Sequence, residues 1–271
     1  MNPTLIFHSN SELLEGPVFD SDNNLLYFVS ILDCLVYCYN PTTREILSVK
    51  LNSPVSCIFF KSKKVIIVSS KDGFFEIDFT TLQKKFVFQI NIDKLVRYND
   101  GIQDDAGRII IGTMGYPEVI DNIGNVYSYD KGAYKTIIKN TTISNGLAFS
   151  ADNNFLYFID TPTKKVAKYK YDIKTGDVTF LSYVIKFKGK SYPDGMCIDK
   201  KGMLWIAEWG GSCISKWNPE NGEKLDEIKL PCLNVTSCCF DNEGNLYIST
   251  AKEDSNDDIY GGGLYYFELN K

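Results

Sequence analysis

Short apolar runs, separated by turns rich in Asp, Asn and Gly, recur along the whole chain. A clear case extends from Ile143 to Asp160, where two apolar runs flank a polar turn at residues 150–154. Each run has the length of a strand, so the pattern predicts a β-hairpin. Similar stretches occur at residues 15–29, 99–112, 194–207 and 236–249. The hairpin is therefore the repeating unit of this sequence.

The spacing of these hairpins, roughly 40–50 residues, is typical of a propeller-type array. Each repeat carries about four short strands, and no helical periodicity is sustained along the chain. We therefore predict one all-β domain over residues 1–271, a six-bladed β-propeller. A β-sandwich is the alternative, but it does not explain a sixfold repeat. Thr4 to His8 forms a strand without a hairpin partner. We expect it to pair with the last blade near Leu264 to Leu269, which would remove a sheet edge.

One polar position has the same place in several repeats. When the hairpins are aligned on the residue that opens each turn, five residues earlier stand Glu15, Asn99, Asn145, Asp194 and Thr236. The first strand of a propeller blade lines the central channel, so these side chains are expected to point towards one place. Two carboxylates and two carboxamides form the all-oxygen set that a divalent ion such as Ca²⁺ takes at roughly 2.3–2.6 Å. The alternative is that the Asn-Gly and Asp-Gly pairs only form turns.

Charge and hydropathy limit the classes of molecule that this protein is expected to bind. The net charge is −5 and no basic stripe is present, which argues against nucleic acid. No apolar run approaches the ~20 residues needed to cross a bilayer, and residues 1–11 lack the features of a secretory signal. The eight cysteines show no paired C-x-x-C spacing, which favours a reduced, cytoplasmic protein. We expect a monomer or weak dimer that acts on a small molecule.

Histidine content limits the chemistry. The chain has one histidine, His8, which is expected to be a strand or surface residue. A catalytic triad built on histidine and a His/Cys zinc site are therefore both disfavoured. If the protein is a hydrolase, a metal ion must activate the reaction.

The motifs around the repeated position resemble one family over essentially the whole chain. They are EGPVF at Glu15, RYNDG at Arg97, ISNGL around Asn145, PDGMCID around Asp194 and TSCCF at Thr236. They resemble the SMP-30/gluconolactonase/LRE family, which includes regucalcin and bacterial sugar lactonases. The resemblance implies a six-bladed propeller with one divalent metal held by Glu15, Asn145 and Asp194. Asn99 would reach the metal directly, through water or through substrate.

The resemblance also implies roles in a reaction. Arg97 would contact the substrate and Asp194 would be the general base of a lactonase that opens a sugar lactone to its aldonic acid. Ca²⁺ is the expected ion, with Mn²⁺, Mg²⁺ and Zn²⁺ as alternatives. Two other functions stay open: hydrolysis of another ester or of a phosphotriester, and a calcium-binding regulatory propeller without turnover.

The sequence departs from the family pattern after Gly112-Thr113-Met114. Regucalcin-type lactonases carry two glutamates shortly after this motif, whereas here only Glu118 follows, displaced along the loop. Glu118 is a candidate substrate ligand, although this change places sugar recognition of that kind in question. Trp209 and Tyr116 are candidate wall residues of the site, with packing between blades as the alternative.

Overall fold

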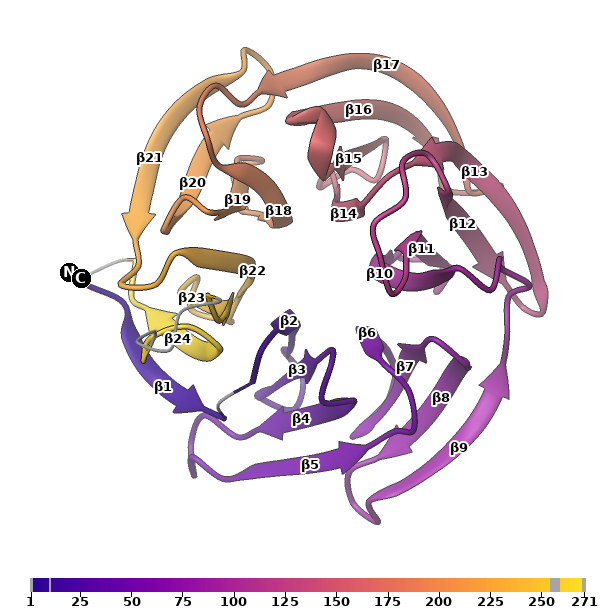
Figure 1. Cartoon of the computed structure of the whole chain (residues 1–271), viewed down its shortest axis with the longest axis vertical. Coiled ribbons are helices and arrows are strands. Elements are labelled where there is room, and N and C mark those ends of the chain that lie inside the picture. Colours follow the sequence, from indigo (N-terminus) through magenta and orange to yellow (C-terminus); the bar gives the residue numbers. More distant parts are fainter. Residues whose placement is uncertain (1, 10, 254–258, 270–271) are drawn as a thin grey trace.

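The computed structural model describes residues 2–9, 11–253 and 259–269, and they form six four-stranded antiparallel sheets around a central axis (Figure 1). The first blade contains β2 (Leu14–Asp20), β3 (Leu25–Ser30), β4 (Leu35–Tyr39) and β5 (Ile46–Lys50). The second contains β6 (Val55–Ser62), β7 (Val65–Ser70), β8 (Gly73–Asp78) and β9 (Gln83–Phe88). The third contains β10 (Val96–Gln103), β11 (Ile109–Gly115), β12 (Gly124–Asp130) and β13 (Ala133–Thr141).

The remaining blades repeat this order from the channel outwards. The fourth contains β14 (Ser144–Phe149), β15 (Phe155–Asp160), β16 (Lys165–Asp172) and β17 (Asp177–Lys186), with the short 3₁₀ helix η1 (Thr161–Thr163) after β15. The fifth contains β18 (Tyr192–Ile198), β19 (Leu204–Trp209), β20 (Cys213–Asn218) and β21 (Glu223–Lys229). The sixth contains β22 (Asn234–Phe240), β23 (Leu246–Ala251), β24 (Gly263–Phe267) and β1 (Thr4–His8). The predicted six-bladed propeller is confirmed.

The N-terminal strand closes the ring. β1 is the outermost strand of the sixth blade and pairs antiparallel with β24, with His8 opposite Gly263 and Thr4 opposite Tyr266. The His8 Nε2–H donates to the Gly261 carbonyl at 3.0 Å, on the outside of the propeller. The predicted closure of the last blade is therefore confirmed.

The core is divided into six apolar clusters, each between two adjacent blades. β3 shows the reason, because all six of its residues are buried. Its side chains alternate, so that Tyr27 and Val29 pack towards the second blade while Leu26 and Phe28 pack towards the sixth. An inner strand with neighbours on both faces needs a continuous apolar sequence rather than an alternating one.

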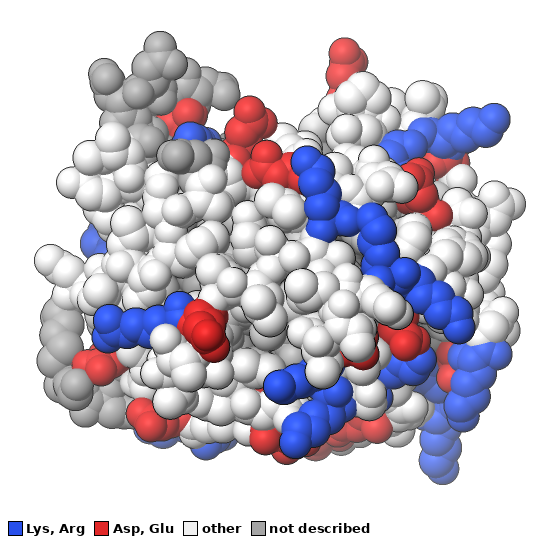
Figure 2. Space-filling model, turned by 90° about the horizontal axis from the view of Figure 1, so that it is seen from below, with Lys and Arg blue, Asp and Glu red and all other residues white. Residues whose placement is uncertain are grey.

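The outermost strands have the opposite character. All residues of β9 are exposed except the half-buried Phe88, and most of β13, β17 and β21 is also exposed. Lysines on such edges hinder pairing with another chain. On the face seen in Figure 2, Lys and Arg are interspersed with Asp and Glu rather than gathered into one area. Within the described residues, no helix has the length and apolar character that crossing a bilayer requires.

Candidate active site at one mouth of the central channel

A β-bulge marks the repeated polar position in every blade. The pairing of each innermost strand with its neighbour shifts register there, between Glu15 and Val18, Val55 and Ile58, Tyr98 and Gly101, Asn145 and Leu147, Pro193 and Met196, and Val235 and Ser237. A bulge bends its strand and redirects the local side chain, and bulges are common beside active sites. The repeated residues are therefore strand residues rather than turn residues.

The glycines beside this position are needed for packing between innermost strands. A Cβ on Gly195 would lie 2.3 Å from Ser237 Oγ and 2.8 Å from the Thr236 carbonyl oxygen on the next blade. A Cβ on Gly146 would lie 2.7 Å from the Asp194 carbonyl oxygen. These contacts are too close for any side chain, so the Asn-Gly and Asp-Gly pairs serve the close approach of neighbouring strands.

The bulges bring the predicted polar residues together. Five of them, together with Thr161 from η1, line the floor of one cavity of about 440 Å³ at one mouth of the channel: Glu15, Arg97, Asn99, Asn145 and Asp194. They come from β2, β10, β14 and β18, four different blades. The fifth member of the repeated column, Thr236, does not line this cavity, and its hydroxyl donates to the Leu14 carbonyl at 2.6 Å.

A chain of hydrogen bonds fixes the neutral side chains of the floor. Arg97 donates from one terminal nitrogen to Asn99 Oδ1 at 2.7 Å and to the Tyr98 carbonyl at 2.9 Å. Asn99 Nδ2 donates to Asn145 Oδ1 at 2.9 Å. Asn145 Nδ2 in turn donates to Thr161 Oγ1 at 2.9 Å, and that hydroxyl donates to a backbone carbonyl. Both amides are thus held in defined orientations.

Arg97 is buried within the described structure without an ion pair. Its side chain is 7% exposed, and Asp104, an acidic residue close to it in the sequence, pairs with Arg108 at 2.6 Å. Burial lowers the pKa of Arg97 to about 10, opposed by the charge of Glu15. Because both hydrogen bonds of Arg97 use the same terminal nitrogen, its other N–H donors are available to a ligand in the cavity.

The carboxylates of the site share a desolvated environment. Burial and the charge of Asp100 raise the pKa of Glu15 to about 8, opposed by the backbone amide of Gly16 and the charge of Arg97. Burial, Glu15 and Asp100 raise the pKa of Asp194 well above its usual range. Burial also raises the pKa of Asp100, the next residue along β10, to about 6. Keeping Glu15 and Asp194 ionised at neutral pH requires additional positive charge.

One buried oxygen shows where such a charge would fit. Asp194 Oδ1 is inaccessible to solvent and has no hydrogen-bond partner. Buried polar atoms are normally paired, so an unpaired carboxylate oxygen beside Glu15 suits a cation. No group of three or more His, Cys, Asp or Glu residues suited to a metal occurs in the described part of the chain. The candidate ligands at this site are of another kind, because two of the four, Asn99 and Asn145, are carboxamides.

The walls of the cavity are apolar. Eight apolar or aromatic side chains line the cavity around the floor: Leu13, Ile31, Met114, Val119, Ile143, Pro162, Tyr192 and Trp209. Trp209 therefore has the predicted wall position, whereas Tyr116 is not among the lining residues. Glu118 is exposed and also does not line the cavity, although its neighbour Val119 does. The structure does not bring Glu118 to the site, and its role in substrate binding stays a prediction.

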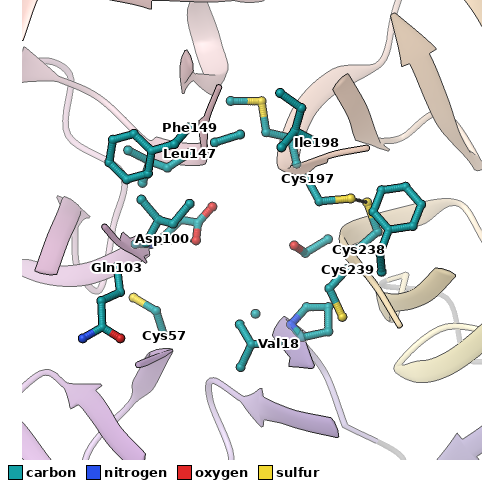
Figure 3. A pocket seen from close by; sticks show the side chains of 18 of the residues that line it. Val18, Cys57, Asp100, Gln103, Leu147, Phe149, Cys197, Ile198, Cys238 and Cys239 are labelled. Atoms are coloured by element: carbon teal, nitrogen blue, oxygen red, sulfur yellow. Dashed lines mark hydrogen bonds between the residues drawn. The ribbon is translucent and has the colours of Figure 1, made fainter. Parts of the chain in front are cut away.

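A second cavity of about 460 Å³ follows further along the same strands. Its lining includes the later residues of the innermost strands, among them Cys57, Asp100, Cys197, Cys238 and Cys239. Figure 3 shows Asp100 and the cysteine side chains grouped around this space. The channel thus has two ends of different chemical character.

Comparison with known proteins assigns the family. Residues 13–252 match the family described as "SMP-30/Gluconolactonase/LRE-like region". The "Putative sugar lactone lactonase YvrE" of Bacillus subtilis (strain 168) is 31% identical over 279 residues, covering 99% of this chain and 95% of that protein. Human regucalcin is 31% identical over 257 residues, covering 92% of this chain and 86% of its own. A luciferin-regenerating enzyme has the same fold, with a TM-score of 0.90 at 27% identity over 99% of this chain and 96% of that one. The chain belongs to the SMP-30/gluconolactonase/LRE-like family.

Proposed function

We propose that the protein is a divalent-metal-dependent lactonase, which hydrolyses the ring ester of a lactone to the open hydroxy acid. The observation that carries this proposal is the unpaired, buried Asp194 oxygen beside Glu15 and Arg97, at the floor of an open cavity. Membership of a family whose relatives include a sugar lactone lactonase by name supports the reaction class.

Glu15, Asn145 and Asp194 would hold the ion. Their oxygens suit hard cations, with Ca²⁺ first and Mn²⁺, Mg²⁺ or Zn²⁺ as alternatives. Asn99 already engages Arg97, Asn145 and the Ser144 carbonyl, so its direct ligation is the weaker part of this assignment. When bound, a divalent ion supplies Lewis acidity that polarises a carbonyl and lowers the pKa of water.

The chain's own residues perform the remaining tasks. Arg97 is positioned by Asn99 to donate from its free nitrogens to a carbonyl or ring oxygen of the lactone. Asp194 accepts a proton from the attacking water as the new C–O bond forms. The proton then passes to the alkoxide oxygen that leaves when the ring ester bond breaks. Burial of the floor strengthens each of these electrostatic interactions.

A pH-stat assay over a panel of lactones, with and without EDTA, tests the proposal. We expect acid release that stops with EDTA and returns when Ca²⁺ or Mn²⁺ is added in excess. Aryl esters and a phosphotriester in the same panel test the other hydrolase activities. If no compound is turned over while Ca²⁺ still raises the melting temperature, a calcium-binding propeller without turnover describes the protein instead.

A further inference from the structure

We propose that the lactone taken by this site carries an apolar chain or ring as its substituent, and that the site discriminates against polyhydroxylated sugar lactones. This inference rests on the proposed function for the bond that is broken, and it adds the class of substituent. The structure carries it through the division of the cavity into a polar floor and apolar walls.

The walls offer apolar surface to a ligand. Tyr192 and Trp209 lie opposite each other on the paired strands β18 and β19, and they are 41% and 36% exposed. Val119, from the 116–123 loop, also lines the cavity and is 54% exposed. Large apolar side chains at a cavity mouth lose contact with water when an apolar ligand covers them, which favours binding.

Apart from the free nitrogens of Arg97 and the two carboxylates, the floor leaves few partners for sugar hydroxyls. Both nitrogens and oxygens of the Asn99 and Asn145 amides already have partners within the floor, and Thr161 accepts from one side and donates to the other. Glu118, the acidic residue expected to contact a sugar, is exposed outside the cavity. Among the wall residues, only the Tyr192 hydroxyl and the Trp209 indole N–H could bond to sugar hydroxyls. Most hydroxyls placed against the walls would therefore lose hydrogen bonds to water without replacement, which weakens binding.

The space is sufficient for such a ligand. A cavity of about 440 Å³ lies within the range of ordinary small-molecule sites. The ring ester would lie on the floor beside Arg97 and Asp194, so its substituent would extend along the walls towards Trp209 and Val119. The carbonyl end and the substituent are thus recognised by separate parts of the cavity.

A series of lactones with one ring and growing alkyl chains tests the inference. We expect kcat/KM to rise by about fourfold per methylene from δ-valerolactone through δ-hexalactone and δ-octalactone to δ-decalactone, as burial of each CH₂ predicts. Glucono-δ-lactone should be hydrolysed less efficiently than δ-octalactone. A flat series, or preference for glucono-δ-lactone over δ-decalactone, overturns the inference and leaves the lactonase proposal standing.

Wall variants locate the effect. Trp209→Gln should lower kcat/KM for δ-decalactone by about tenfold while changing that for δ-valerolactone little. Val119→Thr keeps the side-chain volume and adds a hydroxyl, so a smaller loss of about threefold is expected. Val87→Thr makes the same change on the outer strand β9, where Val87 is 41% exposed, and should have no effect. Equal losses for both lactones, or a similar loss with Val87→Thr, contradict the wall assignment.

Binding without turnover separates the two proposals. Non-hydrolysable δ-lactams with the same chains should change the fluorescence of Trp209, since Trp205 and Trp217 are buried, and Trp209→Phe should remove that change. Tighter binding of longer lactams by a protein that hydrolyses no lactone supports the ligand class and refutes the lactonase. Absence of both chain-dependent binding and hydrolysis refutes both.

Discussion

The two ends of the central channel are lined by the same innermost strands but differ in chemistry. The innermost strands β2, β14 and β18 present Glu15, Asn145 and Asp194 to one mouth. The innermost strands β6, β18 and β22 present Cys57, Cys197 and Cys238 to the other end (Figure 3). Burial raises the pKa of the acidic groups at both ends. A neutral thiol needs no compensating charge, whereas a pair of buried carboxylates that is to act at neutral pH needs a cation.

The cysteines at the thiol end serve as packing residues. Cys197 Sγ lies 3.4 Å from Cys238 Sγ, and no disulfide joins any of the eight cysteines. Cysteine in such a place acts as a small hydrophobic residue. We therefore propose a functional role for the carboxylate mouth of the channel and a structural role for the thiol end, and this division can be tested.

The largest effect is expected from Asp194→Asn, set against Cys197→Ser on the same strand. Asparagine keeps an oxygen but cannot take a proton from water, so lactone hydrolysis should fall by about 10²–10⁴-fold at saturating metal. Cys197→Ser changes one atom at the other end and should leave kcat within about threefold, because it touches no reacting group. Initial rates at matched metal occupancy measure both. A full rate for Asp194→Asn would remove the general base from the mechanism.

The reactivity of the cysteine thiols tests the structural role of the thiol end of the channel. Burial and the charge of Asp100 raise the pKa of Cys57 from 9.0 to about 12, which lowers the thiolate fraction at neutral pH by about a thousandfold. Native protein treated with iodoacetamide should therefore be modified at Cys57 far more slowly than after unfolding, with Cys34 modified first. Peptide mass spectrometry over a time course gives the rates. Rapid modification of Cys57 in folded protein would show that this end is open and polar.

Repetition explains what the sequence alone could predict. The fold, the closure by β1 and the grouping of Glu15, Asn99, Asn145 and Asp194 all follow from one strand phase repeated around an axis. Arg97 came only from the family resemblance, because no other blade has an equivalent. A position that recurs in the innermost strands has its direction fixed by the pairing of that strand with the second strand of its blade and by the bulge between them.

The parts that were missed lie outside this repetition. Thr161 belongs to η1, a feature of one blade, and only its place after the apolar run of β15 could have suggested it. Asp100 stands beside Asn99 in the sequence, but outside the repeated column, and the structure places it in the lining of the second cavity. The walls come from strand ends and from the 116–123 loop, whose course no repeat determines. Glu118 illustrates this, since its neighbour Val119 reaches the cavity and it does not.

Stabilisation of the fold by a metal ion should depend on Glu15 at the first cavity and not on Cys238 at the second. An ion that binds the folded state alone adds about 2.7 kcal/mol at a hundredfold excess over Kd, so Ca²⁺ should raise the melting temperature of EDTA-treated protein. Glu15→Gln removes one charge from the site and should abolish most of this increase, whereas Cys238→Ser should preserve it. Thermal unfolding with and without Ca²⁺, together with elemental analysis, checks both. An equal increase in Glu15→Gln would place the ion elsewhere.

The pH dependence of metal-free protein gives a finer test of the same charge balance. In the folded state without metal, the pKa of Glu15 is raised from 4.5 to about 8, so the folded protein binds more protons than the unfolded chain within that window. The contribution to stability is therefore fully present below pH 4.5 and is lost as pH rises through about 8. Each unit of pKa difference is worth about 1.4 kcal/mol.

Glutamine at position 15 mimics the protonated form, so the free energy of unfolding of Glu15→Gln minus that of the wild type, in EDTA, should grow with pH. Saturating Ca²⁺ should reverse this trend, because the ion stabilises the ionised carboxylates of the wild type and finds a weaker site in the variant. Urea unfolding from about pH 5 to about pH 9 measures the difference. A difference that does not change with pH would mean that Glu15 is ionised in the folded state without any bound cation, and the need for metal at this mouth would lose its electrostatic basis.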